Sequence, residues 1–187
     1  MKLVHLADVP PLHWRNGGGY TRELLRWPDS SNWCLRLSVA DIDRDGPFSA
    51  FPGVTRLFAV LEGAGVRLSW PDRSVELQVA DEPIVFDGAD APVACLLDGP
   101  VRDLNLMCSR GRANLLPASR PWQPGPGSHA GLFACVAGLW WDGDLACRVP
   151  AFTMLWGDVA SGNEWRFQPD TPTRQPGWWI FHEDGYA

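Results

Sequence analysis

The pattern that most restricts the fold of this chain is the spacing of its turn residues. Short runs rich in valine, leucine and aromatic residues are interrupted by Gly, Pro and Asp about every 8 to 12 residues. No stretch of roughly 11 residues or more keeps apolar side chains at i, i+3, i+4 and i+7, the pattern of an amphipathic helix. The sequence therefore predicts an all-β protein whose short strands are joined by tight turns.

Candidate strands fall into two series of unequal length. The first series occupies residues 21–27, 33–39, 54–61, 66–70, 74–79, 83–86, 92–97 and 101–108. The second, shorter series consists of the segments GLFACVAG, LACRVPAFTMLW, EWRFQP and GWWIFH. Because each sheet must bury one face against another layer, the two series predict two barrel-like or sandwich-like halves that share one body.

The segment between the two series sets the expected division of the chain. Residues 111–130 contain four prolines and little periodicity. We therefore predict an N-terminal half over about residues 1–110, a crossover over 111–130, and a smaller C-terminal half over 131–187. Leu115 and Leu116 should hold the crossover against a surface, so it is not expected to act as a flexible tether.

The charge balance restricts the partners of this protein. The 187 residues include 16 basic and 22 acidic side chains, which gives a net charge of -6. Phosphate binding needs a clustered positive surface, so direct binding to nucleic acid or to an anionic membrane is not expected. The N-terminus has no apolar segment of the secretory type, and no run of about 18 apolar residues occurs. These features predict a cytoplasmic protein.

Motifs that would indicate a metal or a cofactor are missing from the sequence. The five cysteines are scattered among apolar neighbours, as expected of reduced core thiols. The four histidines form no HxH or HExxH pattern. Neither GxGxxG nor GxxxxGK[ST] nor GxSxG is found. We therefore predict no metal and no cofactor, and we assign no catalytic residue.

Four segments, read in chain order, resemble the HutD/Ves family of small cytoplasmic proteins. They are WRNGGGYTRE (14–23), GPFSAFPGVTRLFAVLEGAG (46–65), FDG (86–88) and VRDLNLM (101–107). The resemblance implies a cupin-type double-stranded β-helix built as two barrels, a bicupin. It also implies a role in bacterial histidine utilisation, in which binding of a pathway metabolite restrains induction. Urocanate and N-formylglutamate are the implied ligands. The histidine and glutamate ligands of metal-binding cupins are not found here, so the resemblance implies a metal-free pocket.

Arg56 is the central candidate for ligand binding. It lies in the run VTRLFAVL, where it shares one pleat face with Phe58 and Val60. Periodicity leaves two alternatives, an outward solvated side chain or an inward anion receptor, and the family resemblance favours the inward one. An inward guanidinium could bind a carboxylate through two charge-assisted hydrogen bonds, each worth roughly 1.5–3 kcal/mol.

The segment WRNGGGYTRE is the second candidate. Gly18, the middle of three consecutive glycines, would let the backbone approach a ligand with free N–H groups, as in an anion-binding nest. Asn16, Thr21 and Arg22 would add polar contacts, and Trp14 would form a flat apolar wall. Alternatively, the glycines only bend an N-terminal strand at a barrel corner, with Trp14 in the core.

Three further residues complete the predicted ligand-binding set. Phe48 and Ser49 lie in the loop GPFSAFPG, which either forms the rim of a pocket or closes the end of a barrel. Asn105 lies with Asp103 on the polar face of the strand VRDLNLM. These polar groups either satisfy the backbone or a buried arginine, or they offer an amide to a polar ligand.

The leading interpretation is a metal-independent regulatory protein that binds a small carboxylate. No helix-turn-helix or basic stripe is visible, so restraint of induction requires an unidentified protein partner or sequestration of the inducer. The alternative is a metal-independent isomerase, lyase or hydrolase that acts on a small carboxylic acid, with Glu23 or Glu62 as a base.

A third interpretation is an interaction protein, suggested by the pairs Trp140–Trp141 and Trp178–Trp179. Neighbouring residues of a strand face opposite sides, so only one indole of each pair can enter the core. The other indole either lines a homodimer interface or is covered by the other half of the chain.

Overall fold

The computed structural model describes residues 1–160 and 162–183, and within these ranges it is built from β-strands and one short 3-10 turn, η1 (Leu6–Asp8). The all-β prediction is confirmed. The described residues include no helix with the length and apolar character needed to cross a membrane. The chain divides into two compact units, one formed by Pro10–Arg110 and the other by Met1–Val9 together with the chain from Gly111 onward.

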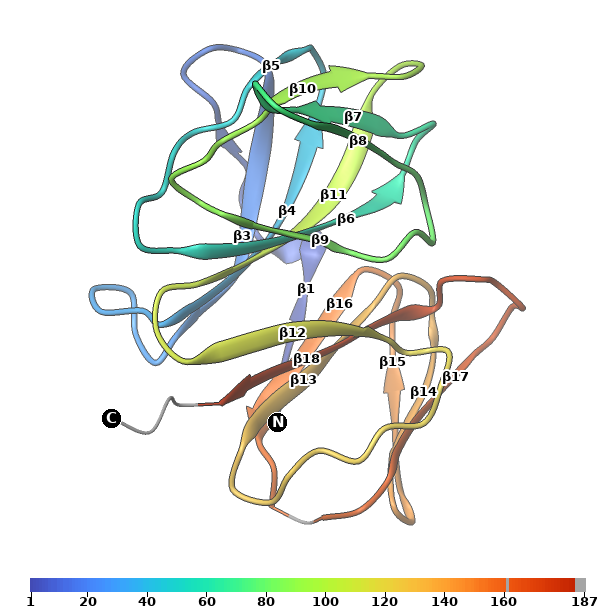
Figure 1. Cartoon of the computed structure of the whole chain (residues 1–187). Coiled ribbons are helices and arrows are strands. Elements are labelled where there is room, and N and C mark those ends of the chain that lie inside the picture. Colours follow the sequence, from blue (N-terminus) through green and yellow to red (C-terminus); the bar gives the residue numbers. More distant parts are fainter. Residues whose placement is uncertain (161, 184–187) are drawn as a thin grey trace. The chain divides into compact units, whose positions relative to one another are not determined.

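The Pro10–Arg110 unit contains two antiparallel sheets (Figure 1). The six-stranded sheet has the order β2 (Leu12–His13), β3 (Gly19–Trp27), β4 (Leu35–Ile42), β11 (Val101–Cys108), β6 (Thr55–Glu62), β9 (Ile84–Asp87). The four-stranded sheet has the order β5 (Gly46–Pro47), β10 (Val93–Leu96), β7 (Val66–Ser69), β8 (Ser74–Leu77). Apolar side chains from both sheets, among them Phe58, Val60 and Leu68, form one buried cluster. Burial of this cluster holds the two sheets together.

The other unit repeats this plan with fewer strands (Figure 1). Its five-stranded sheet has the order β1 (Lys2–His5), β16 (Thr153–Asp158), β13 (His129–Ala134), β18 (Gly177–Glu183), β12 (Arg112–Pro117). Its three-stranded sheet has the order β15 (Leu145–Val149), β14 (Gly138–Asp142), β17 (Trp165–Pro169). The core of this unit is rich in indoles, with Trp140, Trp165 and Trp179 all buried in one cluster. One indole of each predicted tryptophan pair thus fills this core.

The structure differs from the expected division of the chain at two points. Residues 112–117, expected in the crossover, form β12, which pairs with β18, and Leu115 on this strand is buried. The N-terminal strand β1 pairs with β16, so it belongs to the C-terminal unit. A strand of four residues carries too little periodicity to reveal a partner that is distant in the sequence.

The register of the strands in the six-stranded sheet determines which side chains lie together at the candidate site. Three rows of side chains cross β6, β11 and β4 on one face, because residues two apart on a strand point the same way. The rows are Arg56–Met107–Arg36, Phe58–Asn105–Ser38 and Val60–Asp103–Ala40. Polar and charged side chains from three strands are thereby gathered on the face that looks into the unit.

Candidate ligand-binding site

A cavity of about 560 Å³ lies on this face, within the Pro10–Arg110 unit. This volume is in the range of pockets that hold small metabolites. The wall is formed by β2 with the loop that follows it, by β3, β4, β6 and β11, and by the loop that begins at Pro47. The lining residues are Leu12, His13, Trp14, Arg15, Asn16, Thr21, Arg36, Ser38, Ala40, Pro47, Phe48, Ser49, Phe51, Arg56, Asp103, Asn105 and Met107.

Arg56 contributes a buried cation to the cavity. Its side chain is only 4% exposed, and its Nη1 donates to the backbone oxygen of Ser49 at 3.3 Å. Three aromatic rings surround the guanidinium, with ring centroids 5.1 Å (Phe48), 5.1 Å (Phe86) and 5.6 Å (Phe51) from its Cζ. The rings attract the cation through their faces and keep bulk water away from it. Arg56 therefore occupies the inward position that the resemblance favoured.

The electrostatics of Arg56 reflect this burial. Desolvation lowers the pKa of Arg56 to about 10, the charge of Asp103 opposes this shift, and the charge of Arg36 adds to it. The guanidinium still carries its proton at neutral pH, because the pKa remains well above 7. Its Nε atom is buried and has no hydrogen-bond partner among the described residues. A buried cation with an unused donor is a natural receptor for an anion.

Arg36 is placed by an ion-pair cluster at the base of the cavity. The carboxylate of Glu23 lies 2.7 Å from Arg36 Nε and also binds Arg26. A β-bulge between Glu23 and Leu25 brings Arg26 onto the same face of β3 as Glu23. Two arginines share one carboxylate, so the cluster keeps excess positive charge beside the cavity.

Asp103 and Asn105 form the polar wall contributed by β11. Asp103 is 1% exposed and Asn105 is 8% exposed, and each has a buried Oδ1 without a hydrogen-bond partner in the described part of the chain. Burial raises the pKa of Asp103 well above its usual range, the positive charge of Arg56 opposes this, and the negative charge of Asp41 adds to it. The wall can therefore exchange hydrogen bonds with a polar molecule.

The glycine segment shapes the mouth of the cavity without forming an anion nest. The N–H of Gly17 donates to the Trp14 oxygen at 3.0 Å, and the N–H of Gly18 donates to Asn16 Oδ1 at 3.0 Å. The prediction of free N–H groups at these positions is therefore wrong, because the turn uses both itself. At Gly19 a Cβ would lie 2.1 Å from the backbone oxygen of Asp41, so this residue must be glycine for β3 to approach β4. The alternative of a bent N-terminal strand describes the segment better.

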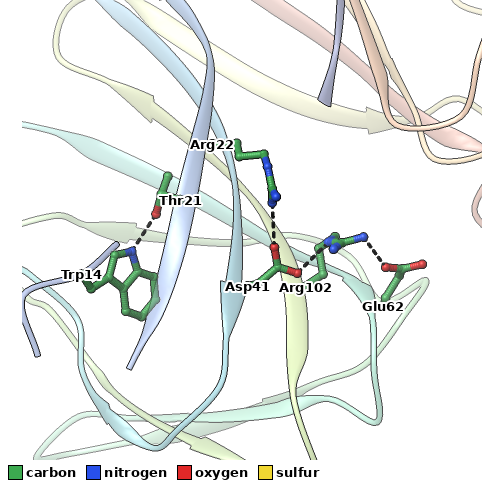
Figure 2. A network of polar contacts seen from close by, with 6 residues as sticks. All are labelled: Trp14, Thr21, Arg22, Asp41, Glu62 and Arg102. Carbon is green, nitrogen blue, oxygen red and sulfur yellow. Dashed lines mark hydrogen bonds and ion pairs between the residues drawn. The ribbon is translucent and has the colours of Figure 1, made fainter. Parts of the chain in front are cut away.

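Trp14 is held against the cavity by its neighbour on β3. Its indole Nε1 donates to Thr21 Oγ1 at 2.8 Å (Figure 2). The Thr21 hydroxyl can still donate its own proton, since it acts as the acceptor in this bond. Trp14 thus supplies the flat apolar wall expected from the sequence.

Arg22 points away from the cavity. Its Nη1 lies 3.3 Å from Asp41 Oδ2, and Asp41 in turn accepts from Arg102, which also pairs with Glu62 (Figure 2). The physical reason is the strand alternation, because Thr21 faces the cavity and the next residue must face the other side. Arg22 therefore belongs to a chain of cross-strand ion pairs.

The predicted ligand-binding residues are largely brought together. Seven of them line the cavity, namely Trp14, Asn16, Thr21, Phe48, Ser49, Arg56 and Asn105, whereas Gly18 and Arg22 do not. The prediction missed Arg36, Ser38 and Asp103. Alternation along each strand could have found them, because Asp103 lies two residues before Asn105 and Arg36 lies two before Ser38.

Two further features bear on the chemistry of the molecule. Across residues 1–160 and 162–183, no group of three or more His, Cys, Asp or Glu side chains is arranged to hold a metal ion. A second hollow, of about 420 Å³, lies in the other unit, where the exposed side chain of Arg166 stacks over Trp141 at 5.7 Å. Its arginines are on the surface, so it lacks the buried charge of the first cavity.

Comparison with known sequences points to one family. A family model described as HutD matches residues 6–131. A 21.2 kDa uncharacterized protein in the hutC 3' region of Pseudomonas putida is 38% identical over 122 residues, which span 62% of this chain and 63% of that protein, less than two thirds of its length. Protein Ves of Citrobacter koseri is 34% identical over 148 residues, which span 77% of each chain.

Solved structures extend the similarity to nearly the whole chain. A conserved protein of unknown function from Pseudomonas aeruginosa PAO1 superposes with a TM-score of 0.81 at 29% identity, over 97% of both chains. HutD from Pseudomonas fluorescens SBW25 superposes with a TM-score of 0.79 at 25% identity, over 97% of this chain and 96% of that one. Oxalate decarboxylase of Bacillus subtilis shares the fold alone, with a TM-score of 0.58 at 12% identity over 99% of this chain and 78% of that one. The predicted family resemblance and the cupin-type fold are confirmed.

Proposed function

Because this chain belongs to the HutD family, we propose that it is a metal-independent protein of histidine utilisation that binds a small carboxylate and restrains induction of the pathway. The observation that carries the proposal is Arg56, a guanidinium that is 4% exposed, faces the cavity and keeps a buried Nε without a partner in the described ranges. The pathway is suggested by the names of the relatives, HutD of Pseudomonas fluorescens and the protein in the hutC 3' region. Urocanate and N-formylglutamate are the ligands we propose.

The energetics of Arg56 support an anionic ligand. Burying a cation is costly, and that cost is visible in the pKa of Arg56, which desolvation lowers to about 10. A ligand carboxylate would supply the missing counter-charge and up to two hydrogen bonds of roughly 1.5–3 kcal/mol each. Since the surrounding rings exclude water, this attraction is screened less than it would be at the surface. A local receptor of this kind can select an anion although the protein as a whole carries a charge of -6.

We propose two ways in which ligand binding restrains induction. The protein either sequesters the inducing metabolite or contacts an unidentified regulatory protein. A homodimer is one form in which the protein could make that contact. Direct binding to nucleic acid is not part of the proposal, because the acidic balance of the chain opposes it. A measurement of inducer concentration in cells that lack or overproduce the protein distinguishes sequestration from partner binding.

A thermal-shift experiment tests the ligand-binding proposal. A ligand present at 100 times its dissociation constant stabilises the folded state by about 2.7 kcal/mol. For a chain of this length that corresponds to a rise of roughly 5–10 °C in Tm. We expect such a rise with urocanate or N-formylglutamate and no rise with the corresponding methyl esters, which lack the free carboxylate. Unchanged melting at millimolar concentrations of both acids contradicts the proposal.

Asp103 favours a second candidate function, a metal-independent enzyme that acts on a small carboxylic acid. A buried carboxyl group whose pKa is raised can act as a general acid or base near neutral pH. The bases expected from the sequence are less suited, because Glu23 is ion-paired with Arg36 and Glu62 pairs with Arg102 outside the cavity. Product analysis after prolonged incubation of protein with urocanate or N-formylglutamate separates the two functions. Intact ligand supports the binding protein, and turnover supports the enzyme.

A further inference from the structure

The role proposed for Arg56 leaves the most deeply buried acid of the cavity unexplained. Asp103 is 1% exposed and lines the cavity, and its Oδ1 has no hydrogen-bond partner among the described residues. Its cross-strand neighbours are Ala40 on one side and Val60 on the other, whose side chains offer no donor. A buried carboxyl group in such surroundings costs stability unless something else satisfies it.

Asp103 and Arg56 influence each other through their charges without forming an ion pair. Within the described ranges no ion pair of 4.0 Å or less joins the two side chains, and Arg56 lies opposite Met107, four residues away from Asp103 along β11. Four residues of strand correspond to about 13 Å of backbone. The two residues therefore start from rows at opposite ends of the cavity-facing part of the sheet, and a ligand bound at Arg56 can extend along β11 toward Asp103.

The surroundings of Asp103 favour its uncharged form. Burial raises its pKa, the charge of Asp41 on β4 raises it further, and Arg56 on β6 is the one group that opposes this shift. The other charged or titratable side chains of the lining are His13, Arg15 and Arg36. A protonated carboxyl group offers one O–H donor as well as an acceptor oxygen. It can therefore bind a neutral oxygen atom that an ionised carboxylate would repel.

We propose that Asp103 is a second recognition residue, whose carboxylic acid donates a hydrogen bond to an uncharged carbonyl or amide oxygen at the end of the ligand remote from Arg56. This inference rests on the proposed function, because it takes the carboxylate of the ligand to lie at Arg56. It narrows the ligand class to small carboxylates that also carry a carbonyl or amide group several bonds away. Arg56 alone would bind different small carboxylates with similar affinity. Asp103 then favours those that also carry a carbonyl or amide oxygen.

Two substitutions and two ligands test the role of Asp103 by calorimetry. N-formylglutamate carries a formamide oxygen, and 2-propylglutarate keeps both carboxylates but replaces the formamide with a propyl group of similar shape. Asp103→Asn keeps a hydrogen-bond donor, and Asp103→Leu removes it. We expect Asp103→Asn to bind N-formylglutamate within about 3-fold of the unsubstituted protein and Asp103→Leu to bind it at least 10-fold more weakly, the loss of about one hydrogen bond.

The propyl ligand provides the control for folding. Both variants should bind 2-propylglutarate as the unsubstituted protein does, which shows that the cavity and Arg56 are intact. The pH dependence gives an independent readout, because affinity for N-formylglutamate should fall as Asp103 ionises with rising pH and should stay level in Asp103→Asn. A merely structural aspartate would affect both ligands equally and leave no such difference.

The outcomes separate this inference from the proposed function. If Asp103→Leu binds N-formylglutamate as tightly as the unsubstituted protein, the inference is overturned and the proposed function stands. If Asp103→Asn loses as much affinity as Asp103→Leu, Asp103 acts as a charged acceptor and the inference is again overturned. If the unsubstituted protein binds neither N-formylglutamate, 2-propylglutarate nor urocanate, the proposed function fails and the inference with it.

Discussion

The interiors of the two units differ although their sheets follow the same plan. In the Pro10–Arg110 unit, part of the space inside remains a cavity of about 560 Å³ lined by Arg56, Asp103 and Asn105. In the other unit, the corresponding space is filled by indoles, with Trp165 packed 5.2 Å from Trp140 and 6.1 Å from Trp179, centroid to centroid. One interior is packed with aromatic rings, whereas the other places a buried guanidinium and a buried carboxyl group beside open space.

The difference indicates that the tryptophan-rich unit mainly contributes stability, whereas the Pro10–Arg110 unit provides the candidate binding site. Filling a barrel with large aromatic rings buries much apolar surface and leaves no room for a ligand. Keeping a charged group in a cavity costs free energy that only a ligand can recover. The tryptophan-rich unit is therefore expected to be the more stable one. Truncation of its buried indoles should destabilise the protein, whereas removal of the buried charge of Arg56 should stabilise it.

The largest effect is expected from Trp165→Ala. Trp165 is 1% exposed and contacts three other tryptophans, so its truncation should leave a large cavity and cost about 3–5 kcal/mol. Urea denaturation measures this loss. The matched control is Trp14→Ala, which removes a half-buried indole beside a cavity that already exists. Equal losses in the two variants would show that the interiors do not differ as described.

A gain in stability is expected from Arg56→Met. Because the pKa of Arg56 is lower in the folded state, the native protein is destabilised while the group is charged, and the penalty disappears as pH rises through about 10. The substitution removes the charge and should stabilise the protein by about 2 kcal/mol near neutral pH, after allowing for the lost ring contacts. Calorimetric melting should show a rise of roughly 4–8 °C in Tm. Arg67→Met, which removes an exposed arginine paired with Glu76, should leave Tm unchanged.

The sequence predicted the interior of the first unit better than that of the second. Alternation along VTRLFAVL and VRDLNLM shows which side chains share a face, but it left Arg56 either outward or inward, and only the family resemblance favoured the inward position that the structure shows. Register across strands could not be read, because it depends on pairing between distant segments. For the same reason the pairing of β1 with β16 was missed. The donors of the glycine turn were mispredicted because they are used within the turn itself.

A smaller and pH-dependent gain is expected from Asp103→Asn. The folded-state pKa of Asp103 is raised, so its contribution to stability is fully present below its unfolded value and is lost as pH rises through the folded value. The asparagine variant should therefore match the unsubstituted protein in acid and exceed it by about 1 kcal/mol at pH values above the folded-state pKa, the usual cost of an unsatisfied buried polar group. Urea midpoints measured across pH check this. A stability difference that does not change with pH would contradict the burial of an ionisable group.

The smallest effect is expected from Arg22→Ala. Arg22 pairs with Asp41 on the face of β3 that points away from the cavity, and a partly exposed ion pair contributes less than about 1 kcal/mol. Ligand affinity should remain within about 2-fold of the unsubstituted value. Thr21→Ala, its neighbour on the cavity face, should weaken binding more, because it releases Trp14. If Arg22→Ala lost more ligand affinity than Thr21→Ala, the binding site would have to include the face of β3 on which Arg22 lies.

The central claim is that Arg56, a buried guanidinium, binds the carboxylate of a small metabolite inside the cavity of the Pro10–Arg110 unit. Isothermal titration of N-formylglutamate and urocanate into the unsubstituted protein, Arg56→Met and Arg67→Met tests it most directly. We expect at least one acid to bind the unsubstituted protein and Arg67→Met alike, and to bind Arg56→Met about 100-fold more weakly, as expected for the loss of a charge-assisted contact. Equal affinity in all three proteins would contradict the account.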